Sequence, residues 1–311
     1  MAILIDPPMW PAHGTSFSHL VSDSSLTELH EFARRAGVPG RAFDEDHYDV
    51  PSARYRELIE LGARAVDGRE LIRALRASGL RVPAHARAGG ALPALERRWL
   101  DLWPDRPDLG EHLLGRWNEE HRHYHGPAHL LAVLRRLDDL TRRGTPGLQA
   151  AGERAPAPSR RVRLAAWFHD AVYDGVPGQD EARSAELARQ MLAENVPAGR
   201  LARQVADLVL CTTDHRIPAG LEAELRGDAA LLIDADLGVL AEPAAGYARY
   251  VAAVRADYAH VGEQAWRAGR AAVLDHLLGA DPLFRTDWAR EHWTQRATEN
   301  LRRERATFGA D

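Results

Sequence analysis

The pattern of apolar and polar residues changes near residue 90. Before it, short apolar runs alternate with amphipathic stretches. The first apolar run ends at Asp6-Pro7-Pro8, which is typical of a buried strand followed by a turn. Two amphipathic stretches end at Gly37 and Gly79, and glycine commonly terminates a helix. The predicted elements are a strand over 2–5, an extended segment over 41–50, and helices over 24–36, 52–61 and 67–78.

After residue 94 the pattern is almost purely helical, with apolar residues three or four positions apart. Leu130, Leu134 and Leu137 illustrate this spacing, and Pro127 before them suits a first helical turn. No strand is expected beyond residue 95. The predicted helices cover 127–143, 160–173, 180–194, 198–213, 228–240, 244–260, 264–278 and 286–307.

These patterns predict an α+β protein. A small α/β domain is expected over residues 1–85 and an all-α domain over 94–311. Residues 86–93 are rich in small side chains and are interpreted as a linker. A second such stretch, 144–159, lies between two helical patterns and is interpreted as a long loop.

Composition excludes several kinds of chemistry. The 311 residues, 45% of them hydrophobic, suit about two globular domains. All 40 basic residues are arginine, which excludes a Schiff-base or pyridoxal-phosphate lysine, a P-loop and a kinase-type lysine. Cys211 is the only cysteine, so no disulfide forms within the chain. We expect Cys211 to be a small buried apolar residue and not a nucleophile.

Charge and hydropathy limit the expected location and partners. No apolar run approaches the roughly 18 residues of a membrane span, and the N-terminus lacks the pattern of a signal peptide. We therefore expect a cytoplasmic protein with no membrane partner. The net charge of −5 gives no electrostatic support for binding nucleic acid.

Candidate chemistry begins at a group of histidines between residues 112 and 129. His129 falls in the first turn of a predicted amphipathic helix, beside its apolar positions. His125 precedes it by four residues, close enough to share a site if the turn is tight. His121 and His123 are interpreted as part of a solvated approach to this helix.

Carboxylates interrupt two other apolar stretches. His169 and Asp170 are adjacent in one of them, and Asp234 and Asp236 lie in the other. Burial of an unpartnered carboxylate is costly, so each needs a partner. For Asp170, the partner is either a metal ion or an arginine. For Asp234 and Asp236, the alternatives to a metal ion are a helix-capping role and pairing with an arginine.

A single metal site explains these features together. We expect His129, His169, Asp170 and Asp236 to converge from three helices on one or two divalent ions. Mn²⁺, Mg²⁺, Fe²⁺, Co²⁺, Ni²⁺ and Zn²⁺ are not distinguished by these ligands. The set leaves coordination positions open for water and substrate. Glu181, which follows the His-Asp pair, either supports the site or is a surface charge.

The order His…His-Asp…Asp on helices resembles the HD superfamily of metal-dependent phosphohydrolases. The resemblance covers about residues 95–311. Residues 124–129, Tyr-His-Gly-Pro-Ala-His, are similar to the Tyr-His-Asn-x-x-His element of cyclic-nucleotide phosphodiesterases, with Gly126 in place of asparagine. Residues 236–238, Asp-Leu-Gly, are similar to the Asp-Leu-Ser around the last ligand. The resemblance implies that His125 donates a proton and that His129 binds metal.

The resemblance implies hydrolysis of a small phosphorylated substrate, with a nucleotide as the first candidate. Tyr124, beside the expected proton donor, is expected to contact this substrate. A metal-bound module that recognises a phosphorylated ligand without turnover is the alternative. A di-iron oxygenase on the same scaffold is a third possibility, for which His215 is a ready additional ligand.

Three further residues are candidates. His215 is interpreted as a catalytic residue or second-metal ligand, a phosphate contact, or a cation at a helix C-terminus. Arg255 and Arg270 lie in alanine-rich helices and are expected to bind phosphate. Salt bridges of these arginines with Asp257 or Asp275 are the alternative.

The N-terminal residues 3–82 resemble an uncharacterised bacterial domain family that occurs beside HD domains. The matching stretches include Ile5-Asp6-Pro7-Pro8 and Asp46-His47-Tyr48-Asp49. The resemblance implies no activity. The candidates for a second polar site are His13, His19, Asp23, Asp46 and His47, with turn or capping roles as the alternative for Asp23 and Asp46.

Overall fold

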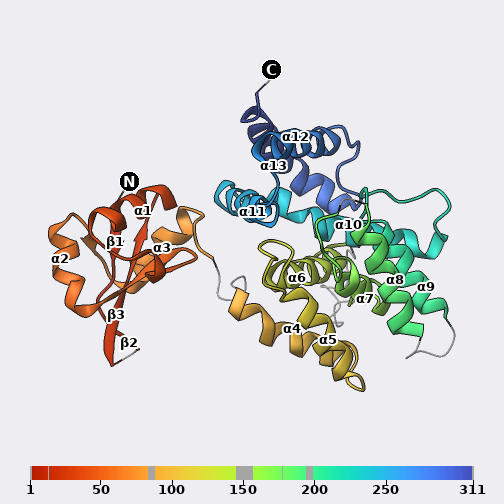
Figure 1. Ribbon diagram of the computed structural model, residues 1–311, viewed down its shortest axis with the longest axis horizontal. Helices are drawn as coiled ribbons and strands as arrows, with labels where there is room; N and C mark the ends of the chain where they lie inside the picture. Colours follow the sequence, from red (N-terminus) through yellow and green to blue (C-terminus); the bar gives the residue numbers. More distant parts are fainter. Residues whose placement is uncertain are drawn as a thin grey trace. The chain divides into compact units, whose positions relative to one another are not determined.

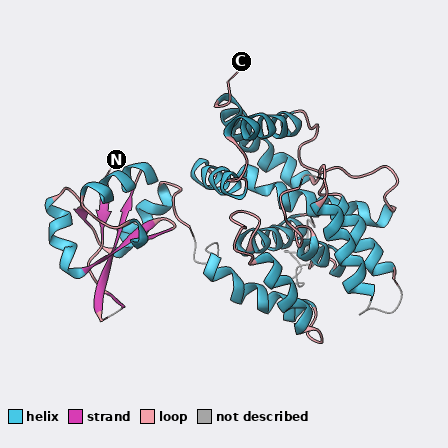
Figure 2. Ribbon diagram, in the orientation of Figure 1, coloured by secondary structure: helices cyan, strands magenta, loops and turns pink. Residues whose placement is uncertain are grey.

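The computed structural model describes residues 2–12, 14–82, 88–144, 157–176, 178–193 and 199–309. Its contacts divide the chain into two compact units. The first comprises Met1–Arg87 and Pro243–Gly246, and the second comprises Ala88–Glu242 and Tyr247–Asp311. A sheet with helices forms the first unit, whereas the second is helical (Figures 1 and 2). The predicted α+β class is confirmed.

The N-terminal unit contains a six-stranded mixed sheet in the order β4-β5-β3-β1-β6, with β2 paired to β3. Only β1 and β6 are parallel neighbours. The sequence predicted β1 and the region of β4 and β5 but missed β2, β3 and the two-residue strand β6. Strand β3 buries side chains on both faces and so shows no clean alternation. The strands are β1 Ile3–Ile5, β2 Trp10–Ala12, β3 Thr15–Ser22, β4 Phe43–Asp44, β5 His47–Pro51 and β6 Arg64–Ala65.

Helices cover both faces of this sheet. The helices α1 (Leu26–Arg35) and α2 (Tyr55–Glu60) pack on the face that carries Leu20. On the opposite face, α3 (Gly68–Ala77) packs against Val21. Because side chains alternate along a strand, His19 of β3 projects to the same face as Val21. The sheet therefore presents His19 on the side of α3.

The helical unit shows no strand in its described residues. The predicted helix over 127–143 is confirmed residue for residue, and the others differ by a few residues at their ends. No helix of the described residues is long and apolar enough to cross a bilayer. The helices are α4 Ala88–Leu102, α5 Pro107–Trp117, α6 Pro127–Arg143, α7 Arg160–Phe168, α8 Asp180–Ala193, α9 Arg200–Leu210, α10 Arg226–Leu237, α11 Ala244–Asp257, α12 Glu263–Leu278 and α13 Asp287–Ala306.

Helix α4 begins inside the segment that the sequence assigned to a linker. It starts at Ala88, so residues 88–93 are helical. Ala91 and Leu95 are fully buried in the core of the helical unit, and this packing outweighs the low helix propensity of the glycines and of Pro93.

Helix α7 is shorter than predicted, because it ends at Phe168 and not at Tyr173. The Arg122 guanidinium donates to the carbonyl oxygens of Asp170 and Ala171. The N–H of Val172 bonds to the Ser184 hydroxyl. Backbone groups after Phe168 thus find partners outside the helix, and the chain turns there.

Helices α6, α7 and α10 pack on one another in the middle of the helical unit (Figure 1). The largest fully buried side chains of this region include Trp117, Trp167 and Phe168. Such a densely packed core holds the three helices in a fixed arrangement. Any polar group that these helices direct inward is therefore held rigidly.

Candidate metal centre

Four polar residues meet where α6, α7 and α10 pack. His129 lies in the first turn of α6, His169 and Asp170 directly follow α7, and Asp236 is near the end of α10. The Nε2 atoms of the two histidines are 3.2 Å apart. His129 Nε2 is 3.2 Å from Asp236 Oδ1, and His169 Nε2 is 3.2 Å from Asp170 Oδ2. The structure thus brings together all four residues that the sequence proposed as ligands.

The orientation of the imidazoles fits a metal ion. His169 Nδ1 lies 2.8 Å from the Ala166 carbonyl oxygen and must donate to it. In the neutral ring, Nε2 then carries a lone pair, and it faces Nε2 of His129. Metal–nitrogen bonds of about 2.0–2.1 Å at a near-right angle place two nitrogens about 3 Å apart. The nitrogen pair and its two carboxylates are therefore a donor set that a divalent cation satisfies.

The electrostatics of the cluster also call for positive charge. Burial lowers the pKa of His129, and Asp236 does not compensate for it. Burial also disfavours charge on His169, but the carboxylate of Asp170 outweighs this and raises the pKa of His169 to about 9. In turn His169 holds the pKa of Asp170 below its usual range despite burial. A proton or a metal ion can supply the charge that these carboxylates require.

Asp236 connects this cluster to His215. Its Oδ1 faces His129, whereas its Oδ2 lies 3.1 Å from His215 Nε2. His215 adopts a left-handed backbone conformation with φ of 54°, and its carbonyl oxygen accepts from Arg285. A carboxylate that faces histidines on both sides is suited to bridge two ions. His215 is thus placed as the sequence suggested for a residue of the site.

Glu181 of α8 lies near the same cluster. Its Oε2 atom is buried and has no hydrogen-bond partner in the described part of the chain. Burial, together with the negative charge of Asp170, raises the pKa of Glu181. Of the two roles considered for Glu181, its partial burial beside Asp170 favours support of the site over a surface charge.

His125 is held by a carboxylate that the sequence did not assign to the site. His125 Nδ1 lies 2.7 Å from Oδ2 of Asp257, the last residue of α11. The Asp257 side chain is fully buried and also accepts from the backbone N–H groups of His123 and Tyr124. These hydrogen bonds keep the pKa of Asp257 below its usual value although burial opposes this. The distance of 132 residues left no sequence signal for the pair.

Arg122 is a second residue that the sequence missed. Its guanidinium is buried and donates to the carbonyl oxygens of His125, Asp170 and Ala171. It also lies over the ring of Trp117. Arg122 therefore ties the loop that carries His125 to the turn that carries Asp170.

Aromatic rings form the surroundings of these side chains. The fully buried Trp117 lies 5.3 Å from the ring of His169, and Tyr173 stacks on His125 at 4.1 Å. Tyr124 lies 4.7 Å from the His129 ring, and burial raises its pKa well above the usual value. Tyr124 therefore lies beside the expected metal ligands.

The two arginines proposed as phosphate contacts are engaged elsewhere. Arg270 is buried in a bidentate ion pair with Glu304, at 2.7 and 3.0 Å. Arg255 donates to the Tyr258 carbonyl oxygen and lies over Trp266. The salt-bridge alternative holds for both arginines but with partners other than Asp257 and Asp275. Glu304 of α13 pairs with Arg270, and Glu263 of α12 pairs with Arg255.

Other predictions of the sequence resolve into structural roles. His121 and His123 are exposed, as expected for a solvated approach. Asp234 accepts from the backbone N–H and the hydroxyl of Thr286, the residue that caps α13. Cys211 is buried, as expected, and burial raises the pKa of its thiol to about 11.

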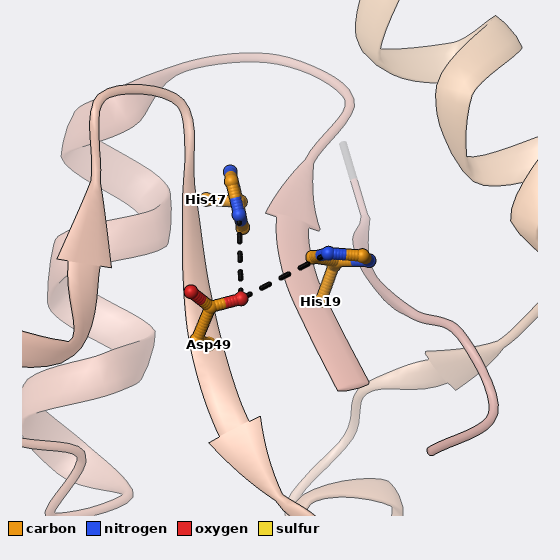
Figure 3. A group of neighbouring side chains, drawn as sticks. All are labelled: His19, His47 and Asp49. Atoms are coloured by element: carbon orange, nitrogen blue, oxygen red, sulfur yellow. Dashed lines mark ion pairs between the residues drawn. The ribbon is translucent and has the colours of Figure 1, made fainter. Parts of the chain in front are cut away.

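The residues proposed for a second polar site in the N-terminal unit fall into two groups. His19 and His47 lie together with Asp49, which the sequence did not propose (Figure 3). Asp46 contacts His47. Asp23 instead accepts from the backbone N–H of Ala2 and lies outside this cluster. The proposed residue His13 lies outside the described residues.

Comparison with known proteins concerns the N-terminal unit. Residues 3–78 match a family described as a protein of unknown function, DUF4031. The expectation of an uncharacterised domain family in this region is thereby confirmed. No curated protein and no solved structure gives a significant match to the chain.

Proposed function

We propose that the helical unit is a metal-dependent phosphohydrolase that cleaves a small phosphate ester. The convergence of His129, His169, Asp170 and Asp236, with the two imidazole Nε2 atoms 3.2 Å apart, carries this proposal. The order of these residues along the chain, which resembles that of HD phosphohydrolases, supports it.

In this proposal the four residues hold a divalent ion, and Asp236 and His215 accommodate a second one. A bound divalent ion supplies Lewis-acid polarisation of a phosphoryl oxygen and lowers the pKa of a bound water. The buried histidines contribute rigid nitrogen donors, because His129 lies on the packed helix α6 and His169 directly follows the packed helix α7.

His125 is the proton donor to the leaving oxygen in this proposal. Asp257 accepts the Nδ1–H of His125, which fixes the ring orientation. The Nε2 atom on the other side of the ring is then free to carry the transferred proton. Stacking on Tyr173 restricts the imidazole further.

The paired His125 and Asp257 favour catalysis over recognition without turnover. A module that only binds a phosphorylated ligand gains nothing from an oriented proton donor. A di-iron oxygenase needs more histidine ligands than a phosphohydrolase. Among the described residues, His215 is the one additional histidine at the metal cluster, and this supports hydrolysis.

Hydrolysis of nitrophenyl phosphate, bis-nitrophenyl phosphate and a nucleotide panel in the presence of Mn²⁺ tests this function. We expect activity that a chelator abolishes and that Asp170→Ala removes together with the metal held by the helical unit. Asp139→Asn, an exposed change on α6, is the matched control and should retain both. Absence of turnover on all substrates by metal-loaded protein would contradict the proposal.

A further inference from the structure

A second cluster of histidine and carboxylate groups lies on the sheet of the N-terminal unit. His19 of β3 is directly opposite Asp49 of β5 in the strand register. His47 precedes Asp49 by two residues on the same strand, so the three side chains share one face of the sheet. Figure 3 shows them converging. Asp49 Oδ1 lies 3.8 Å from His19 Nε2 and 3.4 Å from His47 Nε2.

Each imidazole is held from behind by a buried carboxylate. His19 Nδ1 lies 2.9 Å from Asp6 Oδ2, and His47 Nδ1 lies 2.7 Å from Asp46 Oδ1. Both carboxylates are almost completely buried. A neutral histidine that donates its Nδ1–H to a carboxylate presents an unprotonated Nε2. Such a hydrogen bond is the usual support of a histidine that binds metal.

We propose that His19, His47 and Asp49 form a divalent transition-metal site of two histidines and one carboxylate, with Asp6 and Asp46 as positioning residues. The three ligand atoms lie within 4.8 Å of one another. Two imidazoles and a carboxylate suit Mn²⁺, Fe²⁺, Co²⁺, Ni²⁺ or Zn²⁺. Three protein ligands leave coordination positions open, as in metal sites that bind a substrate.

The open side of this cluster faces a cavity of about 1090 Å³. Its lining includes the cluster, the exposed ring of Trp10, and Arg69, Arg73 and Arg76 of α3. In the described part of the chain no carboxylate pairs with these three arginines. Metal and arginines together favour an anionic ligand, so the geometry points to a phosphate or carboxylate group as the ligand beside the ion.

The competing explanation is a purely ionic network. Without metal, one or both histidines would be imidazolium ions paired with the surrounding aspartates. Both arrangements direct the two Nε2 atoms towards Asp49. Co²⁺ binding separates the two explanations, because a network of imidazolium–carboxylate pairs has no vacant nitrogen ligand.

The number of Co²⁺ ions bound per full-length chain tests the site. In a His129→Ala/Asp170→Ala background, which disables the proposed helical site, we expect one Co²⁺ to remain. Adding His19→Ala should remove it, and so should Asp49→Asn, a change of a half-exposed side chain that leaves the sheet core intact. His30→Gln is the matched histidine control, because His30 bonds Tyr48 instead.

The same loss of one Co²⁺ is expected when His19→Ala is made in the otherwise unaltered chain, so the result does not depend on the helical substitutions. Asp46→Asn should weaken Co²⁺ binding by about 10–100-fold without changing the coordination spectrum. Retention of the ion in both His19→Ala and Asp49→Asn would overturn the proposal. The absence of any bound Co²⁺ in the His129→Ala/Asp170→Ala variant would also overturn the proposal. This result does not depend on the activity of the helical unit.

The anionic ligand is tested with inorganic phosphate as the probe. Phosphate added to the Co²⁺-loaded background variant should shift the Co²⁺ absorption spectrum. Arg73→Gln should weaken this effect about tenfold, the contribution of one charge-assisted hydrogen bond. Arg34→Gln on α1, which removes the same charge outside the cavity, should not. Equal effects in the two variants would contradict the role of the arginines.

Discussion

His125 and Asp257 form a hydrogen bond of 2.7 Å although 132 residues separate them in the chain. The pair joins the loop before α6 to the C-terminal end of α11. Because Asp257 also accepts from the backbone of that loop, it orients His125 and fixes the loop at the same time. The consequences of losing each partner are therefore different.

Replacement of His125 should impair proton transfer alone. We expect His125→Ala to retain metal and fold but to lose turnover of alkyl phosphate esters by about 10²–10⁴-fold, the usual contribution of a general acid. Nitrophenyl esters should lose less, because nitrophenolate leaves without a proton. The ratio of kcat values for the two leaving groups measures this. An unchanged ratio would show that His125 is not the acid, and His215 would be the next residue to replace.

Replacement of Asp257 should affect both orientation and the loop. Asp257→Asn keeps the shape but removes the carboxylate that accepts the Nδ1–H of His125, so the ring loses its fixed orientation and kcat should fall. Loss of a charged acceptor for three backbone N–H groups should also lower stability by about 1–3 kcal/mol. Urea denaturation with metal bound measures the second effect. A drop in stability with an unchanged kcat would limit Asp257 to a structural role.

The ion pair of Arg270 and Glu304 predicts a structural role for an arginine that the sequence associated with phosphate. Both side chains are nearly buried, so Arg270→Ala leaves an unpaired carboxylate and should destabilise the protein by about 3–5 kcal/mol. The dependence of activity on the concentration of the phosphorylated substrate should not change. Arg255→Ala, which removes a partly exposed guanidinium, should cost about 1 kcal/mol or less. A specific rise in KM for Arg270→Ala with normal stability would contradict this assignment.

Cys211 predicts the pH dependence of thiol modification. Burial raises the pKa of its thiol to about 11, so the folded state disfavours the thiolate. Alkylation at pH 8 should be at least 10²-fold slower in native protein than in urea. The thiol of the unfolded chain ionises at a lower pH than the thiol of the folded chain. The contribution of the thiol to the free energy of unfolding therefore declines as the pH rises above 9 towards 11. Rapid native alkylation at pH 8 would show that the thiol is accessible and has an ordinary pKa.

Local sequence patterns were sufficient for most helices and for selecting the four residues that meet where α6, α7 and α10 pack. The helix over 127–143 has regularly spaced apolar residues, which predict the helix itself. A local proline and a local glycine mark its two ends. Likewise a carboxylate or imidazole within an apolar stretch must find a partner, and this cost marked His169, Asp170 and Asp236 before any fold was known.

Residues whose role depends on distant partners were not predictable. Asp257 and Arg122 look like ordinary helix and loop charges until the packing brings His125 and Asp170 to them. The same holds for Asp49, whose place opposite His19 follows from strand pairing. Hydrophobic periodicity reports which face of one element is buried, but the pairing of two elements depends on contacts between them. Tertiary packing therefore determined the support of His125, the end of α7 and the cluster on the N-terminal sheet.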